Sequence, residues 1–226
     1  MAFPTVQTRT TGASSATATS HTVTLPATVN AGDLLFIAFT CGGGSGTTVT
    51  WDNATAGTWT TVANNNSGAT VRGMLLSKVA DGTEGSAALS ITLSAAAQVA
   101  WTIWRITGCQ GAAETSVAAS TSSTVTFGAL APSWGALDTL WIAVGHLNSS
   151  PTVSTYSTSY TDPTRIAGTG TARQTTESVE RLLNTSSETP SAWTISAASN
   201  HVQYTVAIRP AAGSSGLITS AWLTTL

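Results

Sequence analysis

Two short runs of consecutive apolar residues interrupt a chain that elsewhere alternates apolar and hydroxyl-bearing positions. The first run, Leu34–Phe39, follows a turn at Asn30–Asp33, and the second, Leu140–Val144, follows a turn at Gly135–Asp138. A run of five or six apolar residues rich in β-branched and aromatic types is too short for most helices and is typical of a strand covered on both faces. We therefore expect two buried strands at these positions.

Other segments alternate regularly and predict strands with one buried face. In Leu89–Ser94, three apolar residues alternate with Ser, Thr and Ser, which is the pattern of a half-buried strand with a hydroxyl outer face. Val71–Val79 predicts another strand, and Val99, Trp101 and Ile103 predict the inner face of a closing strand. No segment of useful length has helical periodicity, so a parallel sheet with helical crossovers is disfavoured.

Less regular segments connect these strands. Phe3–Ser20 lacks apolar periodicity and is interpreted as an arm or a poorly packed first strand. The glycine-rich segment Cys41–Gly46 is followed by neither a helix nor a Lys, so it predicts a β connection and not a phosphate-binding loop.

The order of these segments repeats once along the chain. Matching segments are separated by offsets of 101 to 105 residues, which is difficult to obtain by chance. The matches are Thr22–Leu25 with Thr124–Phe127, Thr58–Thr60 with Ser159–Thr161, Glu84–Ala87 with Glu188–Ala192, Ile91 and Leu93 with Trp193 and Ile195, and Val99–Ile103 with Val202–Val206. The sequence thus predicts an internal duplication.

Each repeated unit holds seven or eight short strands separated by Gly, Asn, Asp and Pro turns, which predicts an antiparallel sandwich. The strand count and the absence of a Cys-Trp-Cys pattern favour a jelly roll over an immunoglobulin-like sandwich. We expect an all-β protein of two tandem, duplicated jelly-roll sandwiches. Residues 1–111 form the first lobe with its N-terminal arm, residues 112–212 form the second lobe, and residues 213–226 form an apolar tail. A single larger sandwich built from both halves is the alternative.

The composition narrows the classes of partner. Only 8% of the 226 residues are charged, whereas 43 are Thr and 28 are Ser, so neutral hydroxyls must cover the surface. The net charge of -2, with eight scattered Lys and Arg, offers no basic stripe for phosphates and argues against nucleic-acid binding. Weak charge also means weak repulsion between copies, which favours a subunit of a homo-oligomer or larger particle.

The N-terminal segment has neither the basic nor the apolar region of a signal peptide, and no apolar run approaches the length that spans a bilayer. We therefore expect no export and no membrane insertion. Cys41 and Cys109 each follow an apolar strand, and the sequence leaves open whether they form a disulfide.

Several of these turn and strand motifs resemble a group of bacteriophage-encoded β-sandwich proteins, and the resemblance extends from about Ser20 to Pro210. The motifs that carry it are His21–Pro26, Ala31–Leu35, Val79–Gly85, Pro132–Gly135 and Ala207–Pro210. The resemblance implies a virion component, either a head decoration protein or a part of a tail fibre, which is assembled in the host cytoplasm. It implies no enzyme and no functional residue.

Residue types that carry chemistry are few and dispersed. His21, His146 and His201 stand far apart without ligand spacing, so we expect no metal and no other cofactor. No Gly-x-Ser-x-Gly motif occurs, and the carboxylates lie mostly at turns, where Asp bonds nearby amides. The sequence neither shows nor forbids the two converging carboxylates of a glycoside hydrolase. The turn carboxylates are Asp33, Asp52, Asp81, Asp138 and Asp162.

Eight Trp residues are many for this length, and exposed Trp rings are the platforms on which sugars stack. Trp101, Trp141 and Trp193 occupy inward positions and are assigned to cores. Trp51, Trp59 and Trp134 lie near turns and are the candidates for a glycan platform.

The last segment, residues 213–226, has no counterpart in the first unit. It begins with the flexible sequence Gly-Ser-Ser-Gly, and its apolar side chains contribute stability only where something covers them. The candidate assembly residues are Leu217, Ile218, Trp222, Leu223 and Leu226. We expect them to pack against a neighbouring subunit, and the alternative is that they fold back on their own lobe as an added strand.

Two functions from different classes follow. The first is a non-enzymatic structural protein of a bacteriophage particle, which decorates or stabilises the capsid through contacts with other capsid or tail subunits. The second is a tail-fibre or receptor-binding module that recognises a glycan on the host surface.

Overall fold

The computed structural model describes residues 1–52 and 57–212, whose strands form antiparallel sheets and whose one helical element is a 3-10 turn, η1 (Gly44–Gly46). The predicted all-β class is therefore confirmed. No helix among the described residues is long and apolar enough to cross a membrane. The strands are β1 (Thr5–Ala13), β2 (Ala18–Thr24), β3 (Leu34–Gly42), β4 (Val49–Trp51), β5 (Thr60–Ser67), β6 (Val71–Val79), β7 (Ala88–Ala97), β8 (Val99–Thr107), β9 (Cys109–Val125), β10 (Leu137–Asn148), β11 (Val153–Thr155), β12 (Thr161–Ala167), β13 (Gln174–Thr185) and β14 (Trp193–Pro210).

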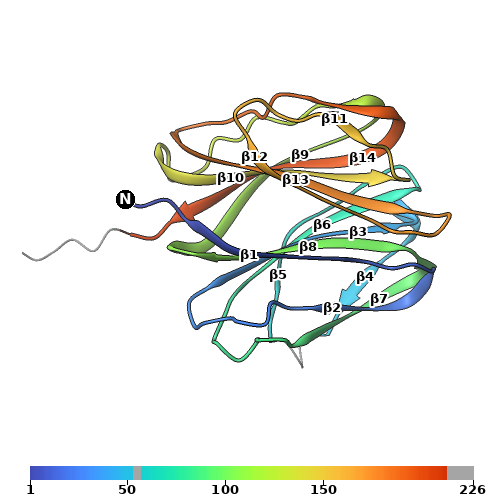
Figure 1. Ribbon diagram of the computed structural model, residues 1–226, viewed down its shortest axis with the longest axis horizontal. Coiled ribbons are helices and arrows are strands. Elements are labelled where there is room, and N and C mark those ends of the chain that lie inside the picture. The colour runs from blue at the N-terminus through green and yellow to red at the C-terminus, as the bar shows by residue number, and fades with distance from the viewer. Residues whose placement is uncertain (53–56, 213–226) are drawn as a thin grey trace, which may run out of the picture.

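The strands form three hydrogen-bonded sheets that stack on one another (Figure 1). The outer sheet has the order β2-β7-β4, and the lower central sheet has the order β1-β8-β3-β6-β5. The upper central sheet has the order β11-β14-β10-β13-β12. Along Val202–Ile208, β14 pairs with β10 on one edge and with β9 on the other. The pairing of β14 with β9 is interrupted between Thr194 and Ser199, and the ends of both strands beyond this break cover the upper central sheet together with β11.

The strand β3 is buried along its whole length because sheets cover both of its faces. Leu35, Ile37 and Phe39 pack in the outer core of the first lobe, against the outer sheet. The alternate residues of β3 pack against the upper central sheet. The strand β10 is buried in the same way from Thr139 to Leu147. The expectation that both apolar runs form strands covered on both faces is thus confirmed.

A central core joins the two lobes. We take the first lobe as residues 1–108 and the second as residues 109–212, because the predicted boundary at residue 111 would divide β9. Each lobe contributes seven fully buried apolar side chains to this core, including Phe36 and Trp104 from the first and Ile142 and Tyr204 from the second. Burial of side chains of this size stabilises by roughly 1.5 to 3 kcal/mol each. The two central sheets therefore pack as the interior of one body.

The strand order of the second lobe parallels that of the first. The lower central sheet reads β1-β8-β3-β6-β5, and the corresponding strands of the upper central sheet read β9-β14-β10-β13-β12. The two apolar runs occupy the third position of these orders, as β3 and β10. This is the arrangement that a duplication requires. Common origin of the lobes, and the jelly-roll assignment, stay predictions.

One predicted match between the repeats places side chains on the wrong face. Val99 and Ile103 pack in the outer core of the first lobe, as expected. Their proposed counterparts Val202 and Val206 instead face the first lobe in the central core. A shift of one residue in a strand reverses every side chain, and because both faces of β14 are buried, its apolar residues alone do not define which face points outward.

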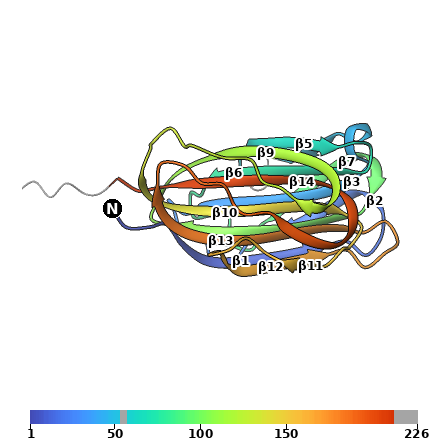
Figure 2. The ribbon, with the colours of Figure 1, turned by 90° about the horizontal axis from the view of Figure 1, so that it is seen from above.

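Both described chain ends lie at the same end of the body, on the left in Figures 1 and 2. The amino group of Met1 lies 3.3 Å from a carboxylate oxygen of Asp138, near the start of β10. At the other end of the chain, Pro210 pairs with Cys109, near the end of β8. The connections of β10 with β11 and of β12 with β13 lie at the opposite end of the second lobe.

Candidate functional site

A polar groove of about 560 Å³ lies at the end of the second lobe opposite the chain ends. The loop Ser149–Pro151 after β10 forms one wall, and the corner Ser196–Asn200 within β14 forms another. Thr121 of β9 and, from the connection of β12 with β13, Thr171 and Arg173 complete the lining. Its volume falls in the range of small-molecule sites, roughly 300 to 1,000 Å³.

The corner exists because β14 passes from one layer to the next at this point. Thr194 pairs with Thr124, but the next paired residue, Ser199, bonds only two positions further along β9, opposite Ser122. The intervening residues include Ser196, Ala197 and Ala198, whose small exposed side chains leave space between the walls. The first lobe has an equivalent corner near the end of β7, where Thr92 pairs with Ser20 but the next paired residue, Ala97, bonds opposite Ala18, and a smaller hollow of about 220 Å³ lies beside it. The groove of the second lobe is therefore the larger of two hollows at corresponding corners.

Hydrogen bonds hold the walls in place. The Ser199 hydroxyl donates to the carbonyl of Asn148 over 2.5 Å, and the Thr175 hydroxyl donates to the carbonyl of Ser149 over 2.8 Å. Ser149 has a φ of 64°, a left-handed conformation that is uncommon for residues other than Gly. The backbone NH of Thr152 donates to the Ser196 hydroxyl over 3.0 Å and so joins the two walls. A site fixed in this way loses little freedom when it binds a ligand.

The predicted glycan-platform residues lie elsewhere. Trp59 is only 4% exposed and belongs to the outer core of the first lobe, so its ring cannot serve as an open platform. Its position after a turn suggested exposure, but the outer sheet covers it. Trp51 is half-buried against the same core, and the two rings line a hollow of about 250 Å³ with Val49 and Thr50.

Trp134 is half-buried near the start of β10, at the end of the lobe away from the groove. The guanidinium carbon of Arg209 lies 6.0 Å from the centre of its ring, and its indole NH donates to the Thr139 hydroxyl over 3.1 Å. The three candidate rings therefore do not form one site. Of the rings assigned to cores, Trp141 and Trp193 are fully buried and Trp101 is partly buried against the outer core.

The predicted assembly residues, Leu217, Ile218, Trp222, Leu223 and Leu226, lie outside the described residues. Their expected packing stays a prediction.

The three histidines occupy separate places and have local partners. The His21 ring nitrogen lies 3.0 Å from the carbonyl of Ala18, and His201 Nδ1 lies 2.8 Å from Gln203 Oε1. Burial lowers the pKa of His146 to about 3, because a charged imidazole would lose its hydration. Within residues 1–52 and 57–212, no group of three His, Cys, Asp or Glu side chains could hold a metal ion.

The two cysteines are free. Cys41 is buried, and this burial raises the pKa of its thiol to about 12. The disulfide that the sequence left open is therefore absent from this structure.

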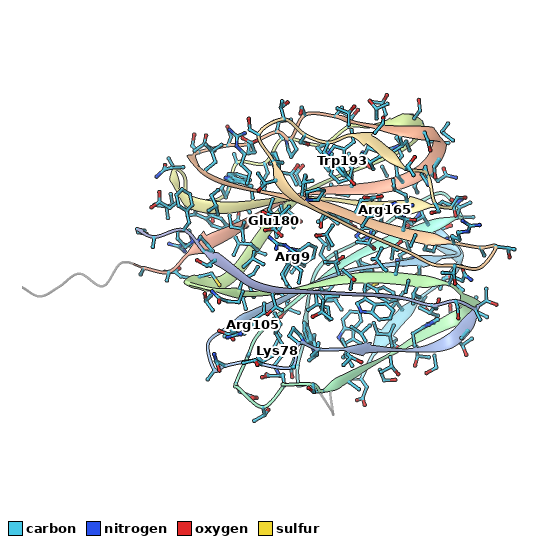
Figure 3. All side chains as sticks on the ribbon, viewed as in Figure 1. Arg9, Lys78, Arg105, Arg165, Glu180 and Trp193 are labelled. Atoms are coloured by element: carbon cyan, nitrogen blue, oxygen red, sulfur yellow. The ribbon has the colours of Figure 1, made fainter. Side chains whose placement is uncertain are left out.

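Buried carboxylates in β13 escaped the sequence reasoning, which placed most acids at turns. Glu180 is 5% exposed and lies between the lobes, where the Arg9 guanidinium donates to both of its oxygens over 2.6 and 2.5 Å (Figure 3). The Trp104 indole NH donates to it over 2.7 Å. The available signal was an acid in a strand of a chain with few charges, since buried acids are nearly always paired.

Glu177 lies on the opposite face of β13, inside the second lobe. The Tyr156 hydroxyl donates to it over 2.7 Å, and Arg165 Nε lies 2.7 Å from its other oxygen. Burial raises the pKa of Glu177 to about 7, although both partners oppose the rise. An odd separation along a strand puts Glu177 and Glu180 on opposite faces, so this pair does not converge across a cleft.

Comparisons of this chain with protein-family models, curated proteins and solved structures found no match.

Proposed function

We propose that this chain is a non-enzymatic structural protein of a bacteriophage particle, attached to other subunits by the end of the body from which both chain ends emerge. The proposal takes its biological setting from the sequence motifs that resemble phage β-sandwich proteins. The distribution of exposed apolar side chains supports the place of attachment.

One observation carries the choice of that end. The described residues have four exposed large apolar side chains, and three of them lie there: Met1 at 60% exposure, Val79 at 53% and Leu182 at 54%. Val79 ends β6 and Leu182 pairs with Leu140, so both stand where the central core opens to solvent. The fourth, Val117, lies in the middle of β9. Clustered apolar exposure is typical of contact surfaces, whereas isolated exposed residues are ordinary.

The small number of charges fits the same role. Five of the eight Lys and Arg residues form ion pairs within the molecule, which leaves a surface of neutral hydroxyls. Such a surface resists self-association weakly, and a subunit fixed in a particle does not depend on charge repulsion for solubility. We propose a homo-oligomer or a contact with a capsid or tail subunit as the partner.

The test compares two sets of exposed residues. Val79→Ser combined with Leu182→Ser removes two exposed apolar side chains at the attachment end, and Val117→Ser removes the one in mid-body. Neither change touches a core, so the free energy of unfolding of both proteins should lie within about 0.5 kcal/mol of the wild-type value. We expect the double variant to lose self-association in sedimentation and co-purification with phage particles, and Val117→Ser to retain both. If the two variants showed the same self-association and the same co-purification with particles, the proposed place of attachment would be wrong.

Deletion of residues 213–226 tests the apolar tail separately. The shortened protein should fold normally, because every described core lies within residues 1–212. It should fail to enter particles if the tail is an assembly arm. Normal incorporation of the shortened chain would show that the tail has no part in assembly.

The groove favours a second candidate function, which is recognition of a ligand on the host surface. It lies at the end away from the chain ends, so a protein attached by those ends would direct the groove outward. Loops held on a rigid sandwich are common places for binding sites.

A further inference from the structure

The groove contains polar groups that the protein leaves for a ligand. Among the described residues, no hydrogen bond engages the Ser149 or Thr171 hydroxyl, the Asn200 amide nitrogen or the terminal nitrogens of Arg173. The Asn200 oxygen is already occupied by the Thr121 hydroxyl, which orients the amide so that its nitrogen is the remaining donor. The Arg173 Nε donates to the carbonyl of Gly170 over 2.8 Å, which fixes the base of the guanidinium.

The groove carries a positive charge without a counter-charge. Its lining, as far as the described residues form it, contains no Asp or Glu. Arg165 reaches its edge by donating to the Ser150 hydroxyl over 2.7 Å, but that guanidinium already has a carboxyl partner, because its Nε lies 2.7 Å from Glu177. Arg173 is exposed and has no carboxylate partner among the described residues. A ligand with one negative charge is therefore favoured over a neutral or cationic one.

The lining also indicates what else the ligand carries. Six of its side chains are Ser or Thr, and a hydroxyl can donate or accept as the partner requires. Pro151, Ala197 and Ala198 provide small apolar surfaces between these hydroxyls. Closely spaced hydroxyls on a ring with exposed C–H groups, as in a saccharide, complement this lining. An extended peptide would need an open strand edge or an apolar pocket, and the groove walls are loops and a strand corner.

We infer that the groove binds a saccharide that carries a carboxylate, with Arg173 pairing with the carboxylate and Asn200 and the hydroxyls bonding the sugar ring. Arg suits this role because its planar fork donates two parallel hydrogen bonds to a carboxylate. Because none of the described residues that line the groove is aromatic, a single site binds weakly, and an oligomer would gain affinity from several sites together. The inference rests on the second proposed function and not on the role as a particle subunit.

The experiment titrates the full chain with N-acetylneuraminic acid, galacturonic acid and neutral galactose, and follows binding by saturation-transfer NMR at low salt. Arg173→Gln removes the charge in the groove. Arg209→Gln is the matched control, since it removes one positive charge at the other end of the same lobe. We expect saturable binding of at least one acidic sugar, weaker binding of galactose, and a loss of about tenfold in affinity for Arg173→Gln alone, equivalent to about 1.4 kcal/mol.

Three results would overturn the inference: no saturable binding of either acidic sugar, equal affinity of the two variants, or complete competition by acetate at the same concentration as the sugar. The last result would show a site for any small anion. Binding of labelled protein to host cells is measured in parallel. Sugar binding without cell binding would leave the groove assignment intact and would refute only the host-surface function.

Discussion

Glu180 connects the two lobes through one buried carboxylate. It accepts hydrogen bonds from Arg9 of β1 and Trp104 of β8 in the first lobe, while it belongs to β13 in the second. Removing a buried carboxylate leaves a guanidinium and an indole NH without their acceptor. Breaking a buried ion pair in this way typically costs about 3 to 5 kcal/mol. We expect Glu180→Ala to lose stability of this order in urea denaturation.

Asp162 provides the control for that prediction. Its carboxylate lies 3.7 Å from the same guanidinium, but its side chain is 56% exposed. Exposed ion pairs contribute about 0 to 1 kcal/mol, because water screens them. Asp162→Asn should therefore change stability little. A similar loss for both variants would mean that the contacts of Glu180 between the lobes add nothing beyond the charge near Arg9.

His146 makes the protein sensitive to acid. With its pKa lowered to about 3, the native ring stays neutral, whereas the unfolded chain takes up a proton below the ordinary value of 6.5. The unfolded state then binds more protons, so this residue's contribution to stability falls as the pH drops from about 6.5 towards 3.

His146→Phe should reduce the acid sensitivity. Within the described residues the ring Nε2 has no hydrogen-bond partner, and Nδ1 lies 3.5 Å from the Thr176 hydroxyl, which is a long contact. The ring packs edge-on against Tyr204, so Phe should replace it with little loss at pH 7. We expect the difference in free energy of unfolding between variant and wild type to shift in favour of the variant as the pH is lowered from 7 to 4. A difference that does not change with pH would contradict the buried neutral state.

At the scale of elements, the hydrophobic pattern predicted a strand well where a simple apolar run or a regular alternation of apolar and polar residues marks it. Val71–Val79 coincides with β6, and the alternation of Leu89, Ile91 and Leu93 matches a fully buried inner face of β7. The pattern failed for β14, where Val202–Val206 is apolar on one face and carries His201, Gln203 and Thr205 on the other, all buried. Those polar groups bond one another or backbone carbonyls, which no local pattern reveals.

Leu89 and Ile195 test the assigned faces of the two outer layers. Each side chain is at most 3% exposed, so Leu89→Asp or Ile195→Asp would bury an unpaired charge at a cost of several kcal/mol, against a total stability of about 5 to 15. We expect either variant to unfold or to melt far below the wild type. Thr92→Asp and Thr194→Asp place the same charge on the exposed faces of β7 and β14 and should leave melting nearly unchanged.

At the scale of the whole molecule, composition and repeats indicated two lobes but did not indicate that the lobes share a central core. The uninterrupted apolar run of β3 marks a strand that is covered on both faces, but it does not show which part of the chain covers the second face. The groove was also beyond sequence reasoning, because its lining comes from four segments between Thr121 and Asn200 that only the fold brings together. Ser, Thr and Ala are common everywhere in this chain, so none of these segments differs in composition from the rest.

The central core predicts that neither lobe is stable alone. Residues 1–108 and residues 109–212 would each expose seven apolar side chains that are fully buried in the intact body. We expect each half to aggregate or to bind a hydrophobic dye when expressed separately, and the two halves to form a soluble complex when expressed together. A separate half that melts cooperatively at the temperature of the whole would contradict this.

Because β3 and β10 are each enclosed by neighbouring strands and by layers on both faces, their amide hydrogens reach solvent only when the body opens as a whole. Amides that exchange only through global opening all report one free energy, whichever lobe they belong to. The exchange rates of the Ile37 amide in the first lobe and the Ile142 amide in the second should therefore rise in parallel as denaturant is added. Hydrogen exchange would then report the same free energy of opening for both lobes.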